Sequence, residues 1–159
     1  MAQFYGDGFL RVSGDRTHLW DMEHAGPGGF SAAGINQWWQ RLVGDVELTT
    51  VYTGLDWVDG DVSVAGTEHS VHHVRGNVTV VGEGHYIHDV VGNVTIDGAS
   101  SITLRRIVGN VAVTGAGSNF DIECAGQVDL GVGGNMARIV QRWGGGTGVG
   151  LHIENWSEV

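Results

Sequence analysis

A five-residue pattern recurs six times along this chain, and its spacing limits what the chain can fold into. Each copy has Gly, then Asn, Asp or Gln, then Val, then any residue, then an aliphatic residue. The copies begin at Gly44, Gly60, Gly76, Gly92, Gly109 and Gly126. So regular a period is typical of a solenoid, in which each repeat contacts mainly its neighbours.

Apolar residues occupy fixed positions relative to these glycines. The column two positions after the glycine is Val46, Val62, Val78, Val94, Val111 and Val128, and further apolar columns lie four after, two before and five before. Such alternation predicts strands with one buried face. Repeats of about 16 to 17 residues are too short for a strand, a helix and two connections. We therefore predict an all-β fold, a single right-handed parallel β-helix with three short strands per coil and coils about 4.8 Å apart.

The corner beside each glycine is also visible in the sequence. Glycine accepts backbone conformations that other residues resist, and Asn or Asp beside it can bond to the nearby backbone. The residues that follow the first five glycines are Asp45, Asp61, Asn77, Asn93 and Asn110. We expect them to stack as a side-chain ladder with a structural role.

The two ends of the chain break the repeat. We divide the chain into an N-terminal cap or attachment segment (1–39), β-helix coils (40–132) and a C-terminal cap (133–159), because a solenoid needs atypical ends. Residues 31–42 can be interpreted as a helix capped by Ser31, or residues 37–43 as an early strand, and we prefer the strand. The glycine-rich run 144–150 lacks the Lys-Ser/Thr ending of a phosphate-binding loop.

The amino-acid composition limits the classes of partner that we expect this chain to bind. The formal net charge is −10, from 8 Arg against 18 acidic residues and no Lys. We therefore expect no nucleic-acid partner, which would need a basic face. No apolar run approaches the ~20 residues that a membrane span needs. The N-terminus lacks the basic start and apolar stretch of a signal peptide, so we expect synthesis in a cytoplasm without export by that route.

Five of the eight histidines fall in two adjacent coils: His69, His72, His73, His85 and His88. The spacing predicts that His69 stacks on His85 and His72 on His88, as outward-facing imidazoles. Stacked imidazoles at this spacing are able to hold Zn²⁺ or Ni²⁺, so these four histidines form an alternative metal site. We predict instead that these histidines lie on a solvated face and bind no metal, and that the chain has no other cofactor.

Positive signs of catalysis are missing from the sequence. Carboxylate pairs such as Asp56 with Asp59 are weak signals in so acidic a chain, and each coil closes too quickly to build the walls of a substrate groove. Cys124 replaces Val or Ile in an apolar column and is expected to be a buried small hydrophobe. We expect no catalytic residue and no enzyme activity.

The six coils and the aromatic-rich first segment resemble the short β-helical structural proteins of tailed bacteriophages: head decoration, minor tail and spike proteins. This resemblance implies a non-enzymatic protein of the virion that forms a homotrimer and binds other virion proteins. The paired His-x-His metal motif of membrane-piercing spike tips does not occur here. The alternative is a carbohydrate-binding or carbohydrate-cleaving β-helix with a surface glycan as partner, using His72, His88, Asp56, Asp89 and Tyr86.

Segment 1–43 holds three of the six Trp and three of the four Phe. A narrow rod cannot bury all of these rings against itself, and buried aromatic residues dominate protein interfaces. We therefore predict partner-binding residues in this segment, namely Phe4, Phe9, Trp20, Phe30, Trp38 and Trp39.

Overall fold

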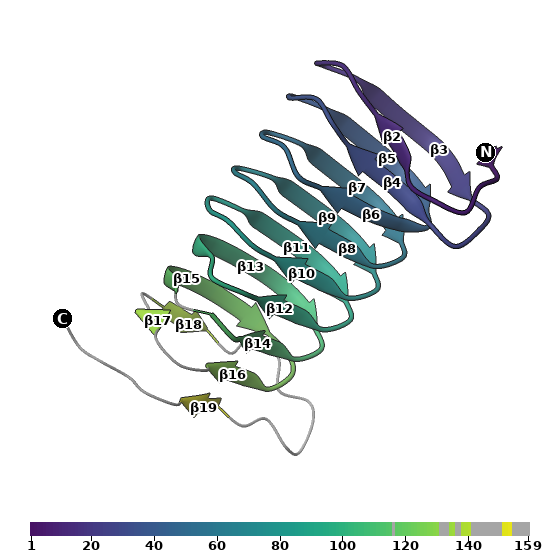
Figure 1. Cartoon of the computed structure of the whole chain (residues 1–159). Coiled ribbons are helices and arrows are strands. Elements are labelled where there is room, and N and C mark those ends of the chain that lie inside the picture. The colour runs from purple at the N-terminus through teal and green to yellow at the C-terminus, as the bar shows by residue number, and fades with distance from the viewer. Residues whose placement is uncertain (116, 131–133, 136–137, 141–150, 154–159) are drawn as a thin grey trace.

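The computed structural model is a solenoid of stacked parallel strands (Figure 1). It describes residues 1–115, 117–130, 134–135, 138–140 and 151–153, and these contain strands but no helix. The strands are β1 (Ala2–Phe4), β2 (Leu10–Val12), β3 (His18–His24), β4 (Gly29–Ala32), β5 (Trp38–Val43), β6 (Asp45–Leu48), β7 (Gly54–Asp59), β8 (Val62–Val64), β9 (Ser70–Arg75), β10 (Val78–Val80), β11 (Tyr86–Val91), β12 (Val94–Ile96), β13 (Ser100–Val108), β14 (Val111–Val113), β15 (Gly117–Cys124), β16 (Val128–Leu130), β17 (Gly134–Asn135), β18 (Arg138–Val140) and β19 (Leu151–Ile153).

Two sheets form the sides of the solenoid. Sheet A has the order β1-β3-β5-β7-β9-β11-β13-β15-β17, with β18 also paired to β15, and sheet B runs β19-β16-β14-β12-β10-β8-β6-β4-β2. Every pairing between these strands is parallel. The parallel solenoid predicted from the repeat is confirmed. None of the described segments is a helix long and apolar enough to cross a membrane.

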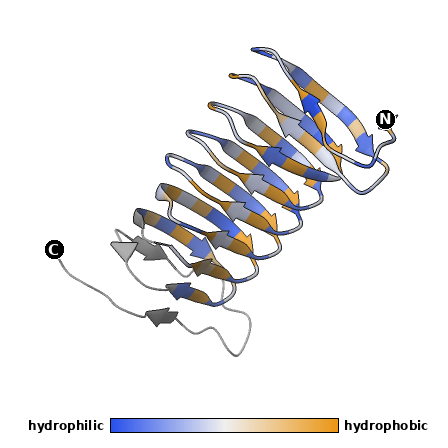
Figure 2. Ribbon diagram, viewed as in Figure 1, coloured by the Kyte–Doolittle hydropathy of each residue, from blue (hydrophilic) through white to orange (hydrophobic). Residues whose placement is uncertain are grey.

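The predicted columns are the hydrogen-bonded registers of the structure. Val78 pairs with Val62 on one side and Val94 on the other, and Val94 pairs with Val111. These side chains are at most 2% exposed and belong to one continuous core between the sheets. Alternating hydrophobic and hydrophilic bands run along the strands (Figure 2). Cys124 is buried in that core, as predicted.

Each coil has two strands where the sequence predicts three. On the third side, the β-pairing between described coils is limited to isolated bridges, Val51 to Thr67, Thr67 to Glu83 and Glu83 to Ser100. The residues after the first two bridging positions, Tyr52 and Glu68, have left-handed backbone at φ 55° and 57°. A left-handed residue interrupts an extended strand, so the third strand shrinks to a single bridging residue.

Segment 1–39 is part of the solenoid rather than a separate cap. Strands β1 and β3 are the first of sheet A, and β2 and β4 are the first of sheet B. The coils therefore extend to the N-terminal side of the boundary predicted at residue 39. The preferred strand for 37–43 is confirmed as β5. Of the predicted C-terminal cap (133–159), only the short strands β17, β18 and β19 lie within the described residues.

The corner ladder takes a definite form. The backbone N–H of Asn77 donates to Asp61 Oδ1 at 2.7 Å, and the N–H of Asn93 donates to Asn77 Oδ1 at 3.1 Å. Equivalent bonds join Asp61 to Asp45, Asn110 to Asn93 and Gln127 to Asn110. Each side chain thus accepts a hydrogen bond from the next coil, which satisfies a corner N–H that the strands do not pair.

Candidate functional site

The outer face of sheet A carries the richest chemistry of the described residues because each of its central strands contains one residue with left-handed backbone. In β9 the inward residues are Val71 and Val74, which leaves His72 and His73 side by side on the outer face. His73 has φ 53°, and Asp89 and Arg106 follow at 58° and 52° in the next coils. One left-handed residue per coil therefore turns two neighbouring side chains outward.

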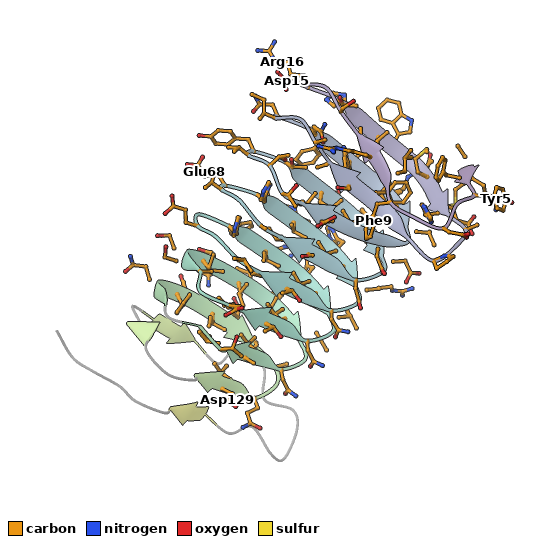
Figure 3. The ribbon with its side chains drawn as sticks, in the orientation of Figure 1. Tyr5, Phe9, Asp15, Arg16, Glu68 and Asp129 are labelled. Carbon is orange, nitrogen blue, oxygen red and sulfur yellow. The ribbon has the colours of Figure 1, made fainter. Side chains whose placement is uncertain are left out.

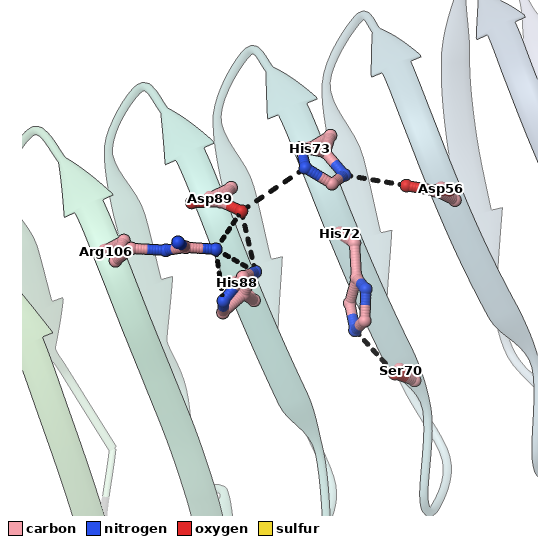
Figure 4. Close-up of polar contacts among 7 residues, drawn as sticks. All are labelled: Asp56, Ser70, His72, His73, His88, Asp89 and Arg106. Atoms are coloured by element: carbon pink, nitrogen blue, oxygen red, sulfur yellow. Dashed lines mark hydrogen bonds and ion pairs between the residues drawn. The ribbon is translucent and has the colours of Figure 1, made fainter.

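These positions form a polar network of Asp56, His73, His88, Asp89 and Arg106, and His72 beside it contacts Ser70 instead (Figure 4). His73 lies between two carboxylates: its Nδ1 is 2.8 Å from Asp56 Oδ1, and its Nε2 is 3.3 Å from Asp89 Oδ2. The same Asp89 oxygen accepts a hydrogen bond from Arg106 Nη2 at 2.5 Å. The network therefore links four successive coils through alternating acidic and basic groups.

His88 completes the network. Its Nδ1 is 2.8 Å from Asp89 Oδ2, and its Nε2 lies 2.6 Å from Arg106 Nη2. Burial lowers the pKa of His88, Asp89 opposes this by favouring the charged imidazole, and Arg106 and the neighbouring histidines lower it further. A neutral imidazole at this position is able to accept a hydrogen bond from the guanidinium, which fits the observed contact.

Trp57 extends the same column toward the N-terminus. Its ring stacks on His73 with centroids 4.6 Å apart and an interplanar angle of 9°. The side chain is still 57% exposed. Stacking along the solenoid axis therefore covers one face of the indole and leaves its edge in solvent.

A groove of roughly 680 Å³ runs beside this column, across strands β5 to β13. One wall is the column of left-handed residues that includes Trp57 and Asp89. The other wall includes Arg75, Val91 and Val108, and the two valines are 58% and 46% exposed. The groove is thus partly apolar and has charged groups of both signs along its rim.

The four histidines of the alternative metal site do not come together. His72 and His88 lie on the outer face of sheet A, with ring centroids 5.4 Å apart. His69 and His85 are 1% exposed and point into the solenoid, so the prediction that they face outward is wrong. Within the part of the chain that the structure describes, no group of three or more His, Cys, Asp or Glu residues is placed to hold a metal ion.

The inward histidines form a ladder of their own. Their rings stack at 5.2 Å, in agreement with the predicted pairing, with an interplanar angle of 11°. His85 Nδ1 accepts the backbone N–H of His69 at 3.2 Å, and its Nε2–H donates to the carbonyl of Val81 at 3.0 Å. His69 bonds in the same way to Thr53 N–H and to the carbonyl of Ala65. This pattern needs neutral rings that carry the proton on Nε2.

Burial explains why these rings stay neutral. It lowers the pKa of His85 to about 4, and it also lowers the pKa of His69. The backbone hydrogen bonds of each ring oppose this shift without cancelling it. The ladder is therefore a structural element of the corner that replaces backbone pairing between coils.

The predicted partner-binding residues divide into two groups. Phe30 and Trp39 are fully buried in the core, so their prediction as contact residues is wrong. Both lie at inward positions of strands within the segment that the sequence assigns to a cap. Phe9, Trp20 and Trp38 are exposed by 49%, 62% and 39%. Phe4 is partly exposed and packs near His24, with ring centroids 5.3 Å apart.

The exposed rings of sheet A gather on one face. Trp20 lies on β3, Trp38 on β5, Trp57 on β7 and Tyr86 on β11, and each is at least 39% exposed. We call this surface the aromatic face. On sheet B, the outward positions of β8, β10 and β12 carry the small polar residues Ser63, Thr79 and Thr95, with Glu47 of β6 and the exposed Phe9 beside them.

Sequence reasoning missed Trp57 and the exposed valines of the groove as parts of a site. The signal was present: the apolar columns five and two positions before each glycine are separated by an odd interval. A flat strand cannot bury two such positions on one face, so the interval requires an irregular residue between them, and the structure has left-handed residues there. Comparison with protein-family models, with curated proteins and with solved structures found no match to the chain.

Proposed function

We propose that this chain is a non-enzymatic structural protein of a virus particle, such as a head decoration, minor tail or spike protein of a tailed phage. It assembles as a homotrimer and binds other virion proteins. The observation that carries the proposal is the aromatic face. Large exposed rings on one side of a chain with net charge −10 are typical of a surface that a protein partner covers.

The construction of the solenoid supports this role. From β6 to β14, each coil closes through short connections, and the strands pair with the coil before and the coil after. Such an arrangement satisfies backbone groups locally and gives a stiff spacer without a cofactor. The outward positions of β8, β10 and β12 in sheet B are small and polar instead.

The test is the mass of the full chain in solution, measured by sedimentation velocity. We expect the native protein to sediment as a trimer and the double variant Trp20→Ser, Trp38→Ser to dissociate, because the rings are removed from the centre of the interface. Tyr52→Ser is the matched control: Tyr52 is 50% exposed but lies outside both sheets. The thermal melting of each variant verifies that it remains folded.

A native protein that is monomeric at about 100 μM, well above the dissociation constants of specific assemblies, would contradict the proposal. So would a double variant with unchanged mass.

Glycan binding is the second candidate, and the groove beside Trp57 favours it. The polar residues expected for that function, Asp56, His72, His88 and Asp89, do meet on the outer face of sheet A, with Tyr86 against His72 at 5.7 Å between ring centroids. Carboxylate, imidazole and aromatic groups together are suited to hydroxyl-rich ligands. Binding of oligosaccharides by the native chain and its loss in Trp57→Ala would favour this candidate over the first.

A further inference from the structure

We propose that the groove beside Trp57 binds a linear acidic polysaccharide in which every second sugar carries a carboxylate. This inference rests on the second candidate function, glycan binding, and names the class of glycan. The groove crosses β5, β7, β9, β11 and β13, so it runs along the axis of the solenoid. Four steps of about 4.8 Å between these strands make it about 19 Å long, which suits a chain of several sugars rather than a single one.

The charges that line the groove alternate from coil to coil. They are Arg41 in β5, Asp59 in β7, Arg75 in β9, Asp89 in β11 and Arg106 in β13. A guanidinium group therefore recurs at every second coil, about 10 Å apart along the axis. Two consecutive sugars of an extended polysaccharide cover a similar length, so one uronate in each disaccharide keeps step with the arginines.

The balance of charge in the groove is opposite to that of the whole chain. The described residues that line it include three Arg and two Asp, whereas the full chain holds 8 Arg and 18 acidic residues. Most of this surface repels an acidic polymer, which is held best where the arginines gather.

The guanidinium groups have donors left for a ligand. Arg75 is exposed, and among the described residues its side chain makes no ion pair, although Asp59 is its neighbour in register. Arg41 and Arg106 contact the aspartates of their ion pairs through Nη2. A guanidinium has five N–H donors, so both arginines keep groups that can bind a carboxylate of the ligand.

The two aspartates explain why the ligand is charged at alternate sugars. Asp59 and Asp89 accept hydrogen bonds, and the hydroxyl groups of a neutral sugar donate them. A polymer with a charge on every unit, such as a polyuronate or a single-stranded nucleic acid, brings anions against both carboxylates. The groove therefore favours uronates separated by neutral sugars.

The apolar part of the groove also suits a glycan. Val91 and Val108 are exposed on the second wall and offer surface to the C–H groups of sugar rings. An extended peptide fits less well, because its backbone N–H and C=O groups would lie over a sheet whose own backbone is already paired.

Calorimetric titration of the native chain with three hexasaccharides tests the class of ligand. The probes are alternating glucuronate and N-acetylglucosamine, N-acetylglucosamine alone, and galacturonate alone. We expect the alternating probe to bind about tenfold more tightly than either of the others, with an affinity that falls as salt is added.

The other outcomes separate this inference from the candidate function. Equal affinity for the neutral probe would leave glycan binding intact and overturn the acidic class. Equal affinity for galacturonate alone would overturn the alternation. Binding of none of the three would overturn both glycan binding and this inference. Tighter binding of a glutamate decapeptide than of the alternating probe would assign the groove to an acidic peptide and contradict the proposal.

Arg75→Gln tests whether the ligand lies in the groove. It removes a guanidinium that makes no ion pair within the described residues, so binding of the alternating probe should weaken about tenfold with an unchanged melting temperature. Arg16→Gln is the matched control, because the exposed Arg16 projects from the corner before β3, whereas the groove lies where the strands of sheet A end (Figure 3). Equal affinities of the two variants would overturn the groove as the site.

Asp59→Asn tests the origin of the alternation. It removes one of the two carboxylates that repel a fully charged chain, so the affinity for galacturonate alone should rise toward that for the alternating probe. An unchanged preference between the two probes would show that the aspartates do not select the ligand.

Discussion

At the scale of single residues, the same histidine spacing produces two different environments. His69 stacks on His85, and His72 neighbours His88 with tilted rings, yet the first pair is buried and the second lies on the outer face. The stacking could be predicted from the period of the repeat. The direction of each side chain could not, because it depends on left-handed backbone at Glu68 and at His73.

The buried ladder predicts how stability depends on pH. The folded-state pKa values of His69 and His85 are depressed, the latter to about 4, so protonation favours the unfolded chain, whose histidines titrate near 6.5. The free energy of unfolding should therefore be highest above pH 6.5 and should fall as the pH drops toward 4. We expect His85 to contribute about 2 kcal/mol to this loss.

Urea unfolding between pH 7 and 4.5 measures that dependence. His85→Gln keeps a hydrogen-bonding side chain but does not titrate, so its stability should fall less steeply than that of the native chain. His18→Ala removes an exposed histidine outside the ladder and is the control. Equal slopes for His85→Gln and the native chain would show that the ladder is not the titrating element.

At the scale of the strands and corners, the period and the apolar columns were sufficient to predict the coils and their register. They were not sufficient to predict the number of strands per coil, because a single left-handed residue such as Tyr52 ends a strand without leaving a pattern in hydrophobicity. Asp89 has left-handed backbone as well. It also creates the polar network, so the part of the site that sequence reasoning missed follows from one backbone feature.

The stacked corner glycines give the prediction at this scale. A Cβ atom built at Gly92 would overlap the carbonyl oxygen of Gly76 in the preceding coil. The backbone would have to move apart, and the corner hydrogen bond between Asn77 and Asn93 would stretch with it. We expect Gly92→Ala to lower the free energy of unfolding by about 2 kcal/mol or more.

Thermal melting of the purified variants checks this expectation. Gly8→Ala is the control, because a Cβ atom there meets nothing within 4 Å. A melting temperature of Gly92→Ala equal to that of Gly8→Ala would mean that the coils do not approach each other as closely as the structure has them.

At the scale of the whole molecule, the sequence shows how many aromatic residues the first segment holds but not how they divide between core and surface. Segment 1–39 forms coils, so Phe30 and Trp39 are buried in the core. Trp20 and Trp38 remain exposed on the aromatic face. The 16- to 17-residue period of the later coils is absent there because the first coils are longer, as the pairing of His18 with Trp38 shows. A solenoid with an aromatic face is suited to assembly.

The central claim is that the chain is a structural component of a virus particle. The most direct measurement is mass spectrometry of intact particles, purified by density gradient from cells that carry the genome encoding this chain. We predict that the chain co-sediments with the particles in fixed stoichiometry to the major capsid or tail protein and resists a salt wash. Recovery of the chain only in the particle-free fractions would contradict the account.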